Sequence, residues 1–230
     1  LLAKNPDGLR AVVINSGCAN ACTGDQGIEN TERSSDLVAT ALRIPAESVF
    51  VMSTGVIGAQ LPMATMQRGI LLAARSLSDD GGHAAARAIM TTDTRPKETA
   101  VRLTLGDQQI TIAGMAKGSG MIHPRMATML SVIVTDAAVE TELLEKAIRE
   151  AVEHSFHRIT IDGDTSTNDT LLLLANGIAG NAQLATDDSE DYQHFVEALT
   201  QVCTTLSQAI VRDGEGATKY VEIEVRGAFS

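Results

Sequence analysis

The chain has 230 residues, of which 44% are hydrophobic and 20% charged, and its formal net charge is −11. This composition is ordinary for a globular protein, and the length suffices for one large α/β domain or two small ones. The negative charge argues against nucleic acid and anionic membrane surfaces as partners. No stretch approaches the roughly 20 apolar residues that cross a bilayer, so we expect a cytoplasmic protein with neither a membrane span nor a signal peptide.

Three cysteines are present, at Cys18, Cys22 and Cys203. An odd and sparse set is unlike a secreted disulfide framework. Cys18 and Cys22 have neither the C-x-x-C spacing nor the paired second half of a zinc site. We therefore expect small buried or loop thiols and no metal.

The first half of the chain alternates strands with helices. The β-branched run 11–14 ends in Asn-Ser-Gly and the run 49–52 ends in Ser-Thr-Gly, so each predicts a short strand passing into a turn. Apolar residues at helical spacing predict a helix through 37–42. A proline suits the first turn of a helix expected at 62–77, and an Ala-rich helix is expected to end near Met90.

The apolar period changes to two in the middle of the chain. Apolar and polar residues alternate at 101–105 and again at 110–112, with Gly106-Asp107 between them. This pattern predicts a β-hairpin. It is followed by an expected apolar strand at 129–134 and an amphipathic helix at 139–152.

The last third of the chain contains one run whose type periodicity leaves open. Residues 171–175 are all apolar, which fits a buried strand or a buried helical segment. A long helix is expected at 192–211, and the alternating run 220–225 predicts a final strand. Because strands and helices are interleaved, a layered α/β or α+β sandwich is predicted.

The Gly-rich run 117–130 carries the first candidate for chemistry, Thr128. A P-loop needs Lys-Ser/Thr after its last glycine, and Met-Ile stands there instead, which argues against nucleotide binding. A Thr at the start of a strand also has an ordinary explanation in β-propensity. Alternatively, cleavage of the backbone before Thr128 would free an α-amine with a pKa of about 8, a built-in base for the Thr hydroxyl.

The loop 53–58, Ser-Thr-Gly-Val-Ile-Gly, follows a predicted strand. A glycine such as Gly55 lets the backbone N–H approach a ligand closely, and the hydroxyl of Thr54 can donate as well. This pair is a candidate oxyanion hole. A plain turn between strand and helix is the alternative.

The acidic run 158–169 resembles a calcium loop in its alternation of oxygen-bearing side chains. An EF-hand loop starting at Asp162 would need Gly at its sixth position and Glu at its twelfth, where Thr167 and Leu173 stand. A turn network of Asx and Ser/Thr side chains is therefore favoured.

Glu215 lies between two glycines in the run 212–219. This placement exposes its carboxylate, which could hold a substrate amine. An exposed acidic hairpin would have the same sequence.

Together these loops resemble the ornithine acetyltransferases, also called glutamate N-acetyltransferases. Six motifs appear in the family's order and extend over nearly the whole chain, at 15–24, 53–58, 90–94, 117–130, 161–170 and 213–219. Cys18 stands where the family more usually has Asn. By this resemblance we expect the chain to lack a leading segment and a long C-terminal portion that supplies further substrate contacts.

The resemblance implies an acetyl transfer in arginine biosynthesis. The precursor would cut itself between Ala127 and Thr128. Thr128 would then take the acetyl group from N-acetylornithine and pass it to glutamate through an acetyl-threonine intermediate. Acetyl-CoA is a possible further acetyl donor, since some family members accept it, and no metal or organic cofactor is implied.

The resemblance also implies the roles of individual side chains. Thr54 and Gly55 match the family's oxyanion hole. Thr91, Lys117, Thr128 and Glu215 match its substrate-contacting positions, with Thr91 chosen over the adjacent Thr92. The charges suit the substrates, since a lysine pairs with a carboxylate and a glutamate with an amine.

The resemblance further implies an αββα-type sandwich of the N-terminal-nucleophile type. Residues 1–127 match the family's α chain and residues 128–230 the start of its β chain, which would assemble as an α2β2 heterotetramer. Two other functions remain open at this point: an N-terminal-nucleophile amidase or aminopeptidase of related architecture, with water as acceptor, and an inactive fragment.

Overall fold

The computed structural model describes residues 6–123 and 129–227. Three 3-10 turns, at Pro6–Gly8, Ala46–Ser48 and Phe156–Arg158, accompany the main elements. In chain order these are β1 (Ala11–Cys18), α1 (Gly24–Leu42), β2 (Val49–Val56), α2 (Met63–Arg75), α3 (Gly82–Ala88), β3 (Lys97–Leu105), β4 (Gln108–Lys117), β5 (Leu130–Thr135), α4 (Thr141–Glu153), β6 (Thr170–Ala175) and α5 (Glu190–Arg212).

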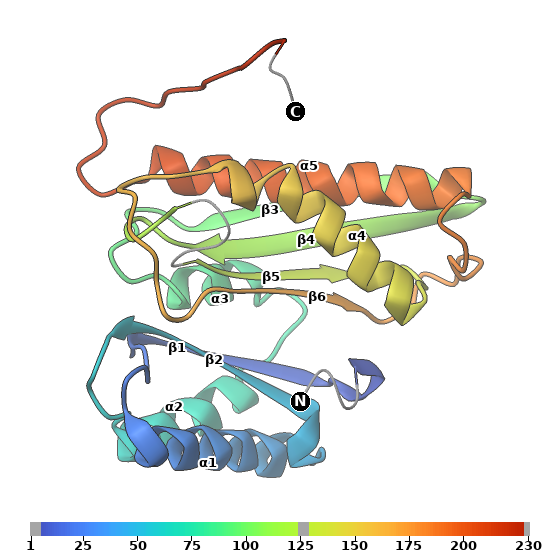
Figure 1. Cartoon of the computed structure of the whole chain (residues 1–230). Helices are drawn as coiled ribbons and strands as arrows, with labels where there is room; N and C mark the ends of the chain where they lie inside the picture. The colour runs from blue at the N-terminus through green and yellow to red at the C-terminus, as the bar shows by residue number, and fades with distance from the viewer. Residues whose placement is uncertain (1–5, 124–128, 228–230) are drawn as a thin grey trace.

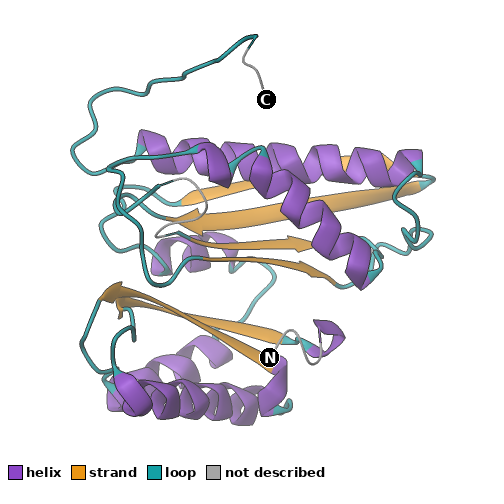
Figure 2. Ribbon diagram, viewed as in Figure 1, coloured by secondary structure: helices purple, strands orange, loops and turns teal. Residues whose placement is uncertain are grey.

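The elements form four layers, as Figure 1 shows. Helices α4 and α5 cover one face of a sheet in the order β3-β4-β5-β6, and the parallel pair β1-β2 lies on its other side. Helices α1 and α2 cover the outer face of that pair. The layers are distinguished by element type in Figure 2. The expected αββα sandwich is confirmed.

The largest core lies between the four-stranded sheet and helices α4 and α5. Strand β4 contributes Ile110 and Ile112, which are both fully buried. They face the same core because alternate residues of a strand point to the same side. Helix α5 contributes apolar residues three or four positions apart, which form one buried face: Phe195, Leu199, Val202, Leu206 and Ile210. The predicted hairpin 101–112 and helices 139–152 and 192–211 are therefore confirmed as β3-β4, α4 and α5.

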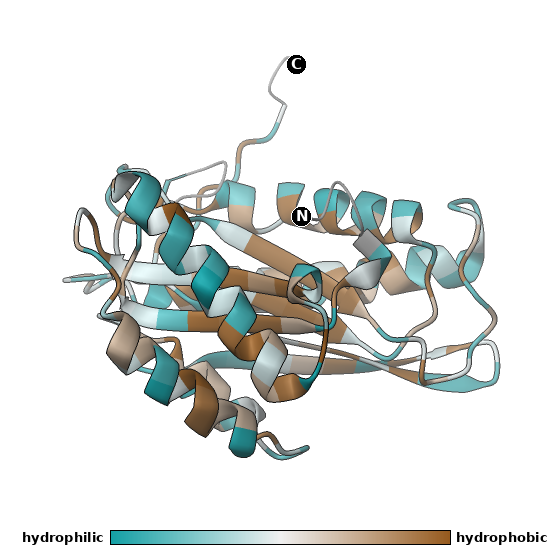
Figure 3. Ribbon diagram, turned by 90° about the horizontal axis from the view of Figure 1, so that it is seen from below, coloured by the Kyte–Doolittle hydropathy of each residue, from teal (hydrophilic) through white to brown (hydrophobic). Residues whose placement is uncertain are grey.

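A second set of apolar contacts joins the two sheets. Met52 of β2, Leu130 and Val132 of β5, and Leu172 of β6 belong to one buried cluster. The next residue of β5, Ile133, faces the opposite core. Strands β5 and β6 are thus apolar on both faces, which explains why periodicity could not classify 171–175. Figure 3 shows hydrophobic residues concentrated along the central strands, whereas the helices carry both hydrophobic and hydrophilic residues.

Strands β1 and β2 extend further than predicted. Their parallel register continues through Asn15↔Ser53 and Gly17↔Gly55 to Cys18 and Val56. The hydroxyl of Ser53 donates to Asn15 Oδ1 at 2.6 Å across the pair. The turn-forming residues that predicted an end to each strand are therefore part of the strands. Asn15 and Ser53 bond to each other across the pair, whereas Ser16 donates to the carbonyl of Ala88 and Thr54 accepts from Lys117.

The predicted final strand at 220–225 is wrong in this structure. The segment follows α5 as a loop, and Val221, Ile223 and Val225 are 70%, 83% and 75% exposed. A strand needs a neighbouring strand for its backbone donors and acceptors, and within 6–123 and 129–227 none lies beside this segment.

Strands β4 and β5 lie on either side of the predicted boundary between residues 127 and 128. They pair antiparallel from Ile112↔Thr135 to Lys117↔Leu130. The two regions therefore share one sheet, and their assignment to separate chains stays a prediction. In the described residues, no helix is long and apolar enough to cross a membrane.

Candidate active site

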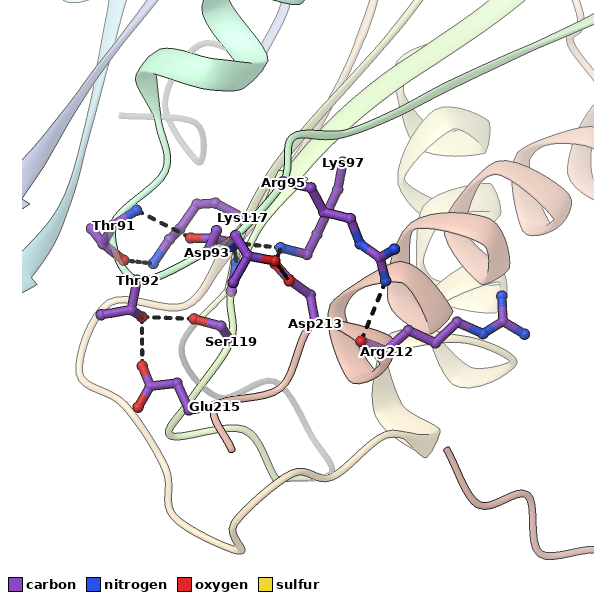
Figure 4. A network of polar contacts seen from close by, with 12 residues as sticks. Thr91, Thr92, Asp93, Arg95, Lys97, Lys117, Ser119, Arg212, Asp213 and Glu215 are labelled. Atoms are coloured by element: carbon purple, nitrogen blue, oxygen red, sulfur yellow. Dashed lines mark hydrogen bonds and ion pairs between the residues drawn. The ribbon is translucent and has the colours of Figure 1, made fainter. Parts of the chain in front are cut away.

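Four of the predicted site residues converge from separate elements. Thr54 lies near the end of β2 and Lys117 ends β4, while Thr91 lies between α3 and β3 and Glu215 follows α5. Figure 4 shows the polar contacts that surround Lys117 and Glu215. Ala127 and Thr128 lie outside the described residues, so the cleavage site and the nucleophile stay predictions.

Lys117 binds the hydroxyls of two residues that were predicted to lie in the site. Its Nζ donates to Thr54 Oγ1 at 3.1 Å and to Thr91 Oγ1 at 2.9 Å, and the residue is 3% exposed. Burial lowers the pKa of the Lys117 ammonium, whereas the nearby carboxylates of Asp93, Glu215 and Asp169 oppose this effect. An ammonium only donates, so the oxygen of Thr54 accepts and its own hydrogen stays available for another acceptor.

Gly55 is required by the close approach of β1 and β2. Its φ is +131°, and a Cβ there would lie 2.3 Å from the carbonyl carbon of Gly17 and 2.6 Å from the amide nitrogen of Cys18. No side chain fits at such distances. The structure therefore gives Gly55 a packing role, beside the oxyanion role that stays a prediction.

Glu215 is held by a residue that sequence reasoning passed over. The hydroxyl of Thr92 donates to Glu215 Oε1 at 2.5 Å and lies 2.7 Å from Ser119 Oγ. The backbone N–H of Glu215 donates to the carbonyl of Ser119 at 2.6 Å. The adjacent Thr91 and Thr92 thus reach different partners, Lys117 and Glu215, and the repeated Thr was the only sequence signal for the second one.

A buried ionic network lies next to the contacts of Lys117 and those of Glu215. Lys97 Nζ lies 2.6 Å from Asp93 Oδ1 and 2.6 Å from Asp213 Oδ2, and all three side chains are at most 3% exposed. Asp93 also accepts from the amides of Gly118 at 2.7 Å and Thr91 at 3.1 Å. The network therefore ties together the segments that carry Thr91, Lys117 and Glu215.

The pKa values of the two acids in this network are set by opposing effects. Burial raises the pKa of Asp93 and of Asp213, but hydrogen bonds and the charge of Lys97 outweigh it, so both lie below the ordinary 3.8. Asp93 and Asp213 stand inside recognised motifs. Lys97 does not, and no pattern in the sequence marks it.

Asp169 contacts the residue that follows the expected nucleophile in the sequence. Its Oδ1 accepts from the amide of Met129 at 2.8 Å, and Met129 is covalently attached to Thr128. Burial raises the pKa of Asp169 to about 6, although the Met129 amide and the charge of Lys117 act in the opposite direction. Asp169 stands inside the motif 161–170, and no role was predicted for it from the sequence.

Comparisons with known proteins assign the sequence to a family. The sequence profile of the ArgJ family matches residues 2–230. The chain belongs to the ArgJ family. It is 55% identical, over 96% of its length, to the "Arginine biosynthesis bifunctional protein ArgJ" of Symbiobacterium thermophilum, and 51% identical over 99% to the protein of the same name from Thermotoga neapolitana.

The chain spans about half the length of these ArgJ relatives, 54% and 57% respectively. A crystal structure of ornithine acetyltransferase from Mycobacterium tuberculosis, complexed with ornithine, is 37% identical. The match covers 52% of this chain and 62% of that one, with a TM-score of 0.42.

Two sequence features of this ArgJ-family chain have structural explanations. Asp162 accepts from the amides of Met121, Ile122 and Asp164, so the expected turn network of Asx side chains is present. The thiol of Cys18 donates to the carbonyl of Ala59 at 3.2 Å.

Proposed function

We propose that this chain contributes the catalytic centre of an acetyltransferase that moves the acetyl group of N-acetylornithine to glutamate. The observation that carries the proposal is the convergence of Thr54, Thr91, Lys117 and Glu215 in a member of the ArgJ family. These side chains offer a hydroxyl and a cation in one hydrogen-bonded group, and an anion held by Thr92, the neighbour of Thr91 in the chain. Such a set suits an amino acid that carries both a carboxylate and an amine.

The first step of the proposed mechanism is self-cleavage. The Thr128 hydroxyl attacks the carbonyl of Ala127, the peptide nitrogen leaves as the α-amine of Thr128, and water hydrolyses the resulting ester. The new α-amine accepts the proton of the Thr128 hydroxyl in later cycles. The two products stay together because β4 and β5 pair along six residues. Assembly as α2β2 is part of the proposal.

Acetyl transfer then occurs in two halves. The Thr128 oxygen attacks the acetyl carbonyl of N-acetylornithine, and the ornithine nitrogen leaves with a proton. The amine of glutamate attacks the acetyl-threonine ester, and the Thr128 hydroxyl is restored. Each attack builds negative charge on the carbonyl oxygen, which the Thr54 hydroxyl and the Gly55 amide stabilise.

Lys117 and Glu215 bind the two ends of the substrate in this proposal. Among the described residues, Thr54 and Thr91 take two of the three hydrogens of the Lys117 ammonium, so the third is left for a substrate carboxylate. Glu215 accepts from the free amine of ornithine. All steps use protein side chains and amides, without a metal or an organic cofactor, and acetyl-CoA remains a candidate second donor.

Denaturing mass analysis of the natural full-length gene product tests the proposal. We expect one fragment ending at Ala127, one beginning at Thr128, and one added acetyl group on the second after incubation with N-acetylornithine. Thr128→Ala should remove both cleavage and transfer, and Thr128→Ser should retain some of each. Transfer retained in Thr128→Ala would refute the assignment. Deacetylation at full rate without glutamate would identify a hydrolase instead.

A further inference from the structure

Two hydroxyl groups connect the protein interior to the carboxylate of Glu215. Ser119 is 2% exposed, whereas Thr92 lies at the surface. Ser119 Oγ lies 2.7 Å from Thr92 Oγ1, which in turn contacts Glu215 Oε1 (Figure 4). The three residues come from three separate segments of the chain, so only the fold brings them together.

The direction of these hydrogen bonds follows from the chemistry of the groups. A carboxylate has no hydrogen to give, so Thr92 must donate to Glu215. A hydroxyl carries one hydrogen, so Thr92 has none left for Ser119, and Ser119 must donate to Thr92. The hydrogens therefore run in a single direction, from Ser119 through Thr92 to Glu215 Oε1. Consecutive hydrogen bonds of one direction reinforce each other.

The backbone fixes the same carboxylate from a second side. A Cβ at Gly120 would lie 3.0 Å from the carboxyl carbon of Glu215 and 3.1 Å from each of its oxygens. The amide of Glu215 is also bonded to the carbonyl of Ser119 at 2.6 Å. The carboxylate thus lies flat against a glycine, with Oε1 engaged by Thr92. In the described residues, no protein donor contacts Oε2.

We propose that Ser119 and Thr92 form a hydroxyl relay that orients Glu215 Oε2 toward the free amine of the substrate and so selects acyl donors that carry a second, cationic amino group. This inference rests on the proposed function, and it assigns positioning roles to two residues that have no part in the chemical step. Loss of the relay leaves Glu215 free to rotate, so the binding of the amine weakens while the acetyl end is unaffected.

The decisive variants are Thr92→Val, which keeps the shape of Thr92 without its hydroxyl, and Thr92→Ser, which keeps the hydroxyl. In the full-length gene product we expect Thr92→Val to raise KM for N-acetylornithine about tenfold, with kcat changed little, since a hydrogen bond to a charged group is lost. For N-acetylnorvaline, which has the same chain without the second amine, KM should not change. Thr92→Ser should restore the wild-type preference between the two donors.

Ser119→Ala and the double variant test whether the two hydroxyls act in series. A relay predicts that adding Ser119→Ala to Thr92→Val has little further effect on KM, because the chain of donors is already broken. Additive effects of the two substitutions would overturn the relay. So would an equal rise in KM for both donors, a fall in kcat alone, or a Thr92→Ser variant that behaves like Thr92→Val.

A calorimetric titration separates this inference from the proposed function. Ornithine and norvaline are titrated into the wild type and into Thr92→Val, with no acetyl group present. We expect Thr92→Val to weaken the binding of ornithine about tenfold and to leave norvaline unchanged. If the wild type transfers acetyl groups but Thr92→Val binds both ligands normally, the relay alone is refuted. If the wild type shows the ornithine preference without transfer, the proposed function alone fails.

Discussion

The buried network around Lys97 makes a quantitative prediction about stability. Lys97→Met keeps most of the side-chain volume but leaves the carboxylates of Asp93 and Asp213 without their cation, 2.6 Å from each. Removing one partner of a buried ion pair costs about 3–5 kcal/mol, because the remaining charge is desolvated and uncompensated. Since domains typically unfold with about 5–15 kcal/mol, we expect Lys97→Met to lose a large part of the free energy of unfolding.

The loss should depend on pH. In the wild type the pKa values of Asp93 and Asp213 are lowered, so their stabilising contribution is present above the unfolded value of 3.8 and is lost as pH falls through the folded values. In Lys97→Met the hydrogen bonds and the charge of the lysine are lost, so burial is opposed only by the remaining hydrogen bonds and both pKa values rise relative to the wild type. The two acids therefore stabilise the fold less than in the wild type as pH rises. The difference between wild type and variant must therefore be larger at pH 7.5 than at pH 4.5.

Urea unfolding at the two pH values measures this difference, with Lys146→Met as the matched control. Lys146 pairs with Asp187 at the surface, where both side chains are about half exposed, and such pairs contribute little. Comparable losses in Lys97→Met and Lys146→Met would refute the reasoning. A loss for Lys97→Met that is the same at both pH values would refute the charge argument in particular.

Two further predictions concern Gly55 and Asp169. Gly55→Ala should lower the free energy of unfolding by more than about 3 kcal/mol, because the new Cβ would overlap the backbone of β1. Gly58→Ala, with φ +82° and open space around it, should lower it by only about 1–2 kcal/mol. Thermal unfolding measures both losses, and equal losses would contradict the packing role of Gly55. Asp169, whose pKa is raised from 3.8 to about 6, destabilises the fold as pH rises between these values. Asp169→Asn should remove this fall in the free energy of unfolding, which is about 1 kcal/mol after allowance for partial exposure. A variant with the same pH dependence of unfolding as the wild type would contradict this account of Asp169.

Sequence periodicity predicted most elements correctly because it reports local burial. Alternation of apolar residues at 101–112, and their helical spacing at 139–152 and 192–211, each reflect one buried face of a strand or helix. The spacing of the apolar residues therefore indicates the type of element. The same reasoning was wrong at 220–225, where the pattern of a strand is present but the structure places no strand beside it. A strand is completed by a partner, and no local pattern states whether the partner exists.

The sequence by itself determined the segments of the site. The motifs around Thr54, Thr91, Lys117 and Glu215 were recognisable. In the structure Lys117 binds Thr54 and Thr91, while Glu215 is held separately by Thr92, the neighbour of Thr91 in the chain. Only the tertiary structure decided how they are held. Lys97 meets Asp213 across 116 positions, and Thr92 meets Glu215 across 123. Contacts at such separations depend on how α5 packs on the four-stranded sheet, and the sequence around each residue carries no trace of them.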